Sequence, residues 1–412
     1  MKNLGIITEY NPFHEGHAFQ LSEAKKRYGA EGVIIVMSGD FTQRGAPAVM
    51  DKYARAKTAL LNGADIVLMM PSLFSVSSAE FFARSGVNTL IHSGVCDTLL
   101  FGSENDDIDS FKEVAKVLID EPEEYKETLK EGLKAGLSFP LAREKAVRRI
   151  IDKKEFFLSS PNNILGLEYV KALMQKGSDI EPIAMKRVGA AYHDASIPNE
   201  TGHFVSSSAL RRVLENETKE DAIKKIKTAL PESIAKPMIE AVEENTIINR
   251  EDAALLLHEA LLRTDDYTVY SDCSEELSNR IRNMRNEYTG FKALNDALKT
   301  KELTYSRISR VLTHIMLDIK EEDVKEAAEL DMAPYIRVLA MNENGEKILS
   351  EMTSKSDVPV ILNVKEAEEK LSPGAYDVFK KDIYAADIFR ALMTQKTGNV
   401  YPNEYTRKYL KV

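Results

Sequence analysis

Short apolar runs alternate with amphipathic stretches over the first hundred residues. Four apolar runs have the length of buried β-strands: residues 4–8, 32–37, 66–70 and 98–101. Three stretches between them repeat apolar positions at helical spacing: residues 17–28, 51–62 and 77–91. Gly29 and Gly63 follow two of these helices, where glycine favours termination. The alternation predicts successive βα units around a doubly wound parallel sheet, which is an α/β fold.

The pattern changes after the fourth expected strand. Residues 106–119 and 121–176 are expected to be mostly helical, with a turn at 159–163, and a fifth strand is expected at 183–187. A serine-capped helix follows Ser206, and charged helical segments with few strand signals continue from there. For a chain of 412 residues we therefore expect two domains. They are an α/β domain at 1–215 and a mainly helical domain at 216–412.

Composition excludes several classes of protein. Hydrophobic residues make up 43% and charged residues 29%, a globular mixture in which no run reaches the roughly 20 apolar residues of a membrane span. The N-terminus lacks a signal-peptide pattern, so we expect a cytoplasmic protein without a membrane partner. Cys96 and Cys273 have no metal-ligand spacing, and neither a metal site nor a disulfide is expected. No protein partner is evident.

The stretch at 11–17, Asn-Pro-Phe-His-Glu-Gly-His, carries the first candidate chemistry. It lies where the first helix begins, and a helix N-terminus offers unpaired N–H groups to phosphate. Gly16 lets phosphate approach the backbone, while His14 and His17 can donate hydrogen bonds to α-phosphate oxygens as pyrophosphate leaves. A His-Glu-x-x-His zinc site is excluded, because His17 follows Glu15 by two positions instead of three. A solvated loop with incidental histidines is the alternative.

A second candidate is the serine cluster at 206–208, which opens a helix and precedes Arg211. A simple N-cap is one explanation for such serines. The other is an anion cradle, in which backbone amides, hydroxyls such as that of Ser207, and Arg211 clamp the β- and γ-phosphates opposite the histidines. The sequence contains no Gly-Lys dipeptide and therefore no P-loop.

These two motifs together resemble the signature of the nucleotidyltransferase superfamily, whose HUP-like fold is shared with class I aminoacyl-tRNA synthetases. Further segments are similar to the bacterial tRNA(Met) cytidine acetate ligase family: 38–45, 51–55, 101–104, 160–163, 186–187 and 303–310. The resemblance covers nearly the whole chain. It implies an ATP-dependent ligase that joins acetate to AMP. The acetyl group then passes to the exocyclic amine of the wobble cytidine in elongator methionine tRNA, without acetyl-coenzyme A.

The resemblance also implies which residues bind ATP, with Mg²⁺, around the catalytic His14 and His17. They are Ile7, Thr8, Glu9, Tyr10, Asn11, Pro12, Phe13, Gly16, Gln20, Gly102, Asn162, Arg187, Ser207 and Arg211. Elementary chemistry agrees at three of them. Gly102 leaves room for adenosine, Asn162 can pair with adenine or ribose, and Arg187 can neutralise phosphate. A turn glycine, a helix cap and a surface ion pair are the respective alternatives.

The loop after the second strand is expected to face the first βα junction. Asp40, Arg44 and Lys52 are therefore candidate substrate-binding residues, with Gln43 and Arg55 on the same edge. A basic side chain here could hold the acetate carboxylate. Asp40 could hold Mg²⁺ or accept a proton from the cytidine amine.

Residues 280–310 are a basic exception in a chain whose net charge is −10. Eight Lys or Arg residues stand against three acids there, with aromatic residues interspersed, as is typical of a tRNA-contacting surface. We expect contacts to tRNA from Arg282, Arg285, Arg307 and Arg310. A solvated helical face is the alternative. Two other functions stay open: a nucleotidyltransferase acting on a small phosphorylated metabolite, and a non-catalytic tRNA-binding protein.

Overall fold

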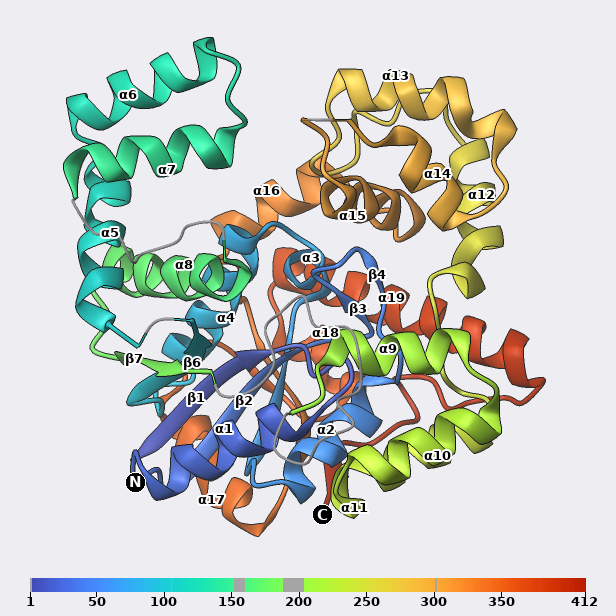
Figure 1. Ribbon diagram of the computed structural model, residues 1–412. Helices are drawn as coiled ribbons and strands as arrows, with labels where there is room; N and C mark the ends of the chain where they lie inside the picture. Colours follow the sequence, from blue (N-terminus) through green and yellow to red (C-terminus); the bar gives the residue numbers. More distant parts are fainter. Residues whose placement is uncertain (1, 105, 152–159, 188–203, 301) are drawn as a thin grey trace.

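The computed structural model describes residues 2–104, 106–151, 160–187, 204–300 and 302–412 (Figure 1). At its centre is a sheet with the strand order β10-β8-β5-β2-β1-β6-β7. Five parallel strands come from the N-terminal half: β1 (Asn3–Thr8), β2 (Gly32–Ser38), β5 (Ile66–Met70), β6 (Thr98–Ser103) and β7 (Glu181–Lys186). The strand order reverses beside β1, which confirms the doubly wound α/β sheet.

Helices cover both faces of this sheet, and alternating residues of β2 show how. Val33 and Ile35 pack with helices α1 (Glu15–Lys26) and α2 (Lys52–Leu61). Ile34 and Val36 belong to the opposite core, which also contains residues of α4 (Ala79–His92), α5 (Ile108–Asp120) and α8 (Pro161–Lys176). Because both faces are buried, the strands have the continuous apolar sequences expected of a parallel sheet.

Two groups of helices rise above the sheet in the view of Figure 1. One is the hairpin of α6 (Glu123–Lys134) and α7 (Phe139–Ile150), and the other is a lobe that contains α12 (Ala254–Leu262), α13 (Glu275–Met284), α14 (Phe291–Leu298) and α15 (Tyr305–Met316). Between them in the chain come α9 (Ser207–Asn216), α10 (Lys219–Ala229) and α11 (Glu232–Glu243). Part of the expected helical stretch 121–176, and residue 159 of the expected turn, lie outside the described residues.

The C-terminal part returns to the sheet, which the sparse strand signals did not predict. β8 (Ile336–Met341) pairs antiparallel with β5 and parallel with β9 (Val360–Ile361) and β10 (Leu410–Lys411). The helices here are α16 (Glu321–Glu329), α17 (Glu343–Lys355), α18 (Ala367–Lys370) and α19 (Pro373–Thr397). One sheet thus holds strands from both sides of residue 215, and the division into two domains stays a prediction. None of the described helices has the length and apolarity needed to cross a bilayer.

Candidate nucleotide site

The junction between β1 and α1 is organised by its two histidines. His14 caps α1, and its Nδ1 accepts a hydrogen bond from the Gly16 amide at 3.0 Å. The His14 amide donates in turn to Nδ1 of His17 at 3.2 Å, and the two imidazole rings stack with centroids 3.7 Å apart. The side chains of His14 and His17 are therefore held rigidly at the N-terminus of α1, where they accept from the N–H groups of Gly16 and His14.

Both imidazoles are neutral at physiological pH. Burial, followed by the charges of Arg187 and Arg211, lowers the pKa of His14 to about 3. Burial also lowers the pKa of His17 well below its usual value. Because each Nδ1 accepts a backbone hydrogen bond, the proton of each neutral ring must lie on Nε2. Each histidine can therefore donate one hydrogen bond from Nε2.

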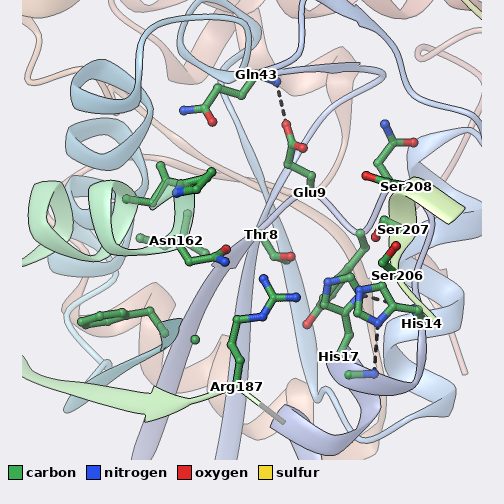
Figure 2. Close-up of a pocket in the computed structure, with 18 of the residues that line it drawn as sticks. Thr8, Glu9, His14, His17, Gln43, Asn162, Arg187, Ser206, Ser207 and Ser208 are labelled. Atoms are coloured by element: carbon green, nitrogen blue, oxygen red, sulfur yellow. Dashed lines mark hydrogen bonds between the residues drawn. The ribbon is translucent and has the colours of Figure 1, made fainter. Parts of the chain in front are cut away.

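The serine-led helix α9 meets this junction directly. Ser207 Oγ donates to the carbonyl oxygen of Pro12 at 3.1 Å, although the two residues are 195 positions apart. Arg211 donates to the carbonyl oxygen of Asn11 and to Ser208 Oγ. The two sequence motifs consequently line one cavity of about 510 Å³ (Figure 2). Ser206 is also an N-cap, since its Oγ accepts from the Ala209 amide at 3.1 Å.

All the expected nucleotide-binding residues except Pro12 and Phe13 line this cavity. Pro12 contributes its carbonyl oxygen to the Ser207 contact, and Phe13 is buried with its ring 4.7 Å from that of Tyr10. Neither side chain lines the cavity, and a contact of these two residues with the nucleotide stays a prediction. The burial of an aromatic ring beside a short loop is decided by packing and leaves no local signal in the sequence.

The cavity has cationic and apolar walls. Arg187 follows β7 and points toward its interior, between Asn162 and the histidines (Figure 2). Asn162 donates from Nδ2 to Glu104 Oε1 at 2.6 Å, which orients its amide at the start of α8. The aromatic residues Phe101 and Tyr169 form part of the apolar wall, and neither was among the residues expected to bind the nucleotide. A polyanion attached to a planar base matches this combination.

Asp40 and Lys52 do not line the cavity, so its geometry gives no support to the substrate contacts expected of them. Lys52 Nζ pairs with Asp40 Oδ2 at 2.6 Å and with Glu404 Oε1 at 2.8 Å, and all three side chains are buried. Arg337 of β8 also pairs with Glu404. The C-terminal segment therefore closes an ion-pair network that holds α2 to the sheet. Of the three candidates in this region, Arg44 alone lines the cavity.

Arg55 lies outside the cavity and holds together the backbone segments beside it. Its buried guanidinium donates to the carbonyl oxygens of Met50 at 3.0 Å, Glu9 at 2.6 Å and Ser38 at 3.2 Å, and also to Gly39. It therefore joins the ends of β1 and β2 without facing the cavity. Among the described residues, no group of three or more His, Cys, Asp or Glu side chains is arranged to hold a metal ion.

Of the four arginines expected to contact tRNA, only Arg310 lines the cavity. Arg307 pairs with Asp272 at 3.1 Å. Arg282 is exposed on α13. Arg285 donates to the carbonyl oxygen of Thr264 at 2.7 Å and pairs with Asp265, so it also holds the lobe together.

Known proteins resemble the chain over its whole length. Residues 1–403 match the family described as HIGH Nucleotidyl Transferase. A tRNA(Met) cytidine acetate ligase of Fervidobacterium nodosum is 35% identical over 99% of this chain and 97% of that protein. One from Clostridium kluyveri is 37% identical over 93% of each.

Two crystal structures of Thermotoga maritima TmcAL are also similar, and each comparison covers 100% of both chains. The apo form has a TM-score of 0.91 at 30% identity. The form bound with alpha-thio ATP has a TM-score of 0.88 at 29% identity.

Proposed function

This chain belongs to the HIGH nucleotidyltransferase family, among the relatives named tRNA(Met) cytidine acetate ligase, and we propose that it is such a ligase. It activates acetate with ATP as acetyl-AMP and transfers the acetyl group to the wobble cytidine of elongator methionine tRNA. One observation carries the proposal. The His14-x-Gly16-His17 junction and the Ser207–Arg211 helix start line one cavity in a chain that closely resembles a protein crystallised with an ATP analogue.

In the first step, a carboxylate oxygen of acetate attacks the α-phosphorus, and the bond to the β-phosphate breaks to release pyrophosphate. The Nε2–H groups of His14 and His17 donate to the α-phosphate oxygens as charge develops. Arg187 and Arg211 neutralise the triphosphate from the other side, with Ser207 at the start of α9. Acetyl-AMP remains in the cavity.

Gly102 and Asn162 line the part of the cavity that is suited to adenosine. A Cβ on Gly102 would lie 3.4 Å from Cγ of Arg187, an ordinary contact, so the glycine serves to keep space open for the ligand. Glu9 is the one carboxylate in the lining among the described residues. Mg²⁺ that accompanies the triphosphate would supply positive charge to the leaving pyrophosphate.

In the second step, the exocyclic amine of cytidine attacks the acetyl carbonyl carbon. A carbon–nitrogen bond forms, the bond between that carbon and the phosphate oxygen breaks, and AMP leaves. A tRNA substrate also implies that the reaction takes place in the cytoplasm.

The test has two measurements on the purified protein. Exchange of labelled pyrophosphate into ATP should depend on acetate, and nucleosides from tRNA incubated with ATP and acetate should include acetylcytidine. Exchange that requires a phosphorylated metabolite instead of acetate would favour a different nucleotidyltransferase. ATP and tRNA binding without any turnover would leave only a binding protein.

A further inference from the structure

The cavity has a second end, beyond the histidines and Arg187. Gln43 and Glu9 lie at this end, at the top of the view in Figure 2, while Arg187 lies at the bottom. Ser306 and Arg310 of α15 also line the cavity. The second end therefore combines residues from the end of β1, from the hairpin of β3 (Phe41–Thr42) and β4 (Ala46–Pro47), and from the helical lobe.

A close backbone contact brings α15 to this end. Gly45, in the hairpin turn, has a φ of +64° and packs against the backbone of Ser309 and Arg310. Ser309 Oγ donates to the carbonyl oxygen of Gly45 at 2.7 Å. Gln43 is two residues from Gly45, and Ser306 and Arg310 lie within one helical turn of Ser309, so this contact brings the segments that carry them together.

Several polar groups at this end lack protein partners. Within the described residues, Gln43 Nε2 and Arg310 Nε are buried without a hydrogen-bond partner. The backbone N–H of Gln43 donates to Glu9 Oε1 at 2.6 Å, which holds the carboxylate in place. No described residue donates to the other carboxylate oxygen, Oε2. Buried donors without partners are costly, and a ligand that accepts hydrogen bonds would satisfy them.

We propose that this end is the acceptor subsite, where the unstacked cytosine binds with its amine on Glu9 and its ring acceptors on Gln43 and Arg310. The inference rests on the proposed function. Cytosine presents an amine donor beside the acceptors N3 and O2, which matches one free carboxylate oxygen and two free donors. Uracil has a carbonyl oxygen in place of the amine and an N–H in place of the N3 acceptor. It would therefore set an acceptor against the Glu9 carboxylate and a donor against the N–H donors of Gln43 and Arg310.

Glu9 also has a chemical role in this arrangement. The cytosine amine forms its bond to the acetyl carbon, AMP leaves with the electron pair of the broken carbon–oxygen bond, and the amine proton passes to Glu9 Oε2. Asp40, to which the sequence analysis gave this role, is buried against Lys52 outside the cavity. Glu9 is the proton acceptor in this arrangement, because it directly follows β1 and lines the cavity.

The experiment separates the two half-reactions in Gln43→Leu, Glu9→Gln and the control Gln175→Leu, which makes the same change on the exposed face of α8. Acetate-dependent pyrophosphate exchange reports activation, and a single-turnover assay reports acetyl transfer. We expect the ratio of transfer to exchange to fall about 10-fold or more in Gln43→Leu and about 100-fold in Glu9→Gln. The control should match the wild type in both assays.

Base recognition gives an independent measurement. A tRNA(Met) with uridine at the wobble position should bind the wild type more weakly than a cytidine tRNA does, and this difference should narrow in Gln43→Leu and in Glu9→Gln, because each variant removes one of the discriminating contacts. An unchanged ratio of transfer to exchange, or equal losses in both half-reactions, would overturn the acceptor subsite. Lack of exchange and transfer in the wild type would instead overturn the proposed function. Thermal melting of each variant identifies losses that come from unfolding.

Discussion

Gly45 and Ser309 lie in direct contact, with the Ser309 hydroxyl donating to the Gly45 carbonyl oxygen at 2.7 Å. A Cβ on Gly45 would overlap backbone atoms of Ser309 and Arg310, and the positive φ of +64° disfavours any other residue here. This contact joins the hairpin of the nucleotide-binding region to the helical lobe. Residues of both parts face one cavity as a result.

Gly45→Ala should therefore destabilise the protein by about 2–4 kcal/mol, and should impair acetyl transfer more than pyrophosphate exchange. Gly29→Ala is the matched control, since Gly29 also has a positive φ, +66°, but no atom lies within 4 Å of its added Cβ. That variant should lose only about 1 kcal/mol. Urea denaturation measures both, and equal losses would contradict a role for the close approach.

His14 should make the free energy of unfolding depend on pH. Its pKa is lowered to about 3 in the folded protein, so between about 6.5 and 3 the unfolded chain binds a proton that the folded protein does not. Stability should decline as pH falls through this window, by up to about 1.4 kcal/mol per pH unit. His14→Asn should show a shallower decline from pH 7 to 5 in urea denaturation. Parallel curves for the two proteins would refute the buried neutral imidazole.

Glu404 should stabilise the fold through its buried partners. Burial alone would raise the pKa of Glu404, but the charges of Lys52 and Arg337 lower it to about 2. The contribution is therefore present above about pH 4.5 and is lost as pH falls toward 2. Glu404→Gln removes the ion-pair partner of the buried Arg337 and leaves Lys52 with Asp40 alone, so it should cost about 3–5 kcal/mol. The exposed Glu369→Gln should cost almost nothing, and similar melting temperatures for the two variants would count against the network.

Arg211 should affect ATP binding. Its guanidinium contacts Asn11 and Ser208 at the rim of the cavity, and it supplies positive charge where the triphosphate is proposed to bind. Arg211→Gln should raise the KM for ATP in pyrophosphate exchange about 10-fold or more. Arg212→Gln makes the same change on the exposed side of α9 and should leave this KM unchanged. An effect of equal size in both variants would point to helix stability.

The tRNA surface is best tested at Arg282 and Lys292, which are both exposed. Reversing both charges to Glu should raise the KM for tRNA and reduce its dependence on salt, while pyrophosphate exchange continues. Arg285 is unsuitable for this purpose, because its contacts with Thr264 and Asp265 hold the lobe together. An unchanged salt dependence would place the tRNA on another face.

The sequence by itself determined the features that are encoded within a short window. The apolar run at 66–70 is β5, residue for residue, because a strand buried on both faces needs a continuous apolar sequence. The two histidines could be placed at the βα junction from the sequence, because the strand, the loop and the helix that define this junction follow one another within a few residues. The serine cap of α9 is local in the same sense.

Only the tertiary structure decided which distant groups meet. Asp40 and Lys52 are plausible substrate contacts by position, yet Glu404 reaches them from 352 residues beyond Lys52 and buries them as an ion-pair network. Arg307 and Arg310 of α15 both pair with Asp272, yet only Arg310 also lines the cavity, because the Gly45 contact fixes the orientation of α15. Periodicity and capping act between near neighbours, but the partner of a buried charge depends on how the whole chain packs.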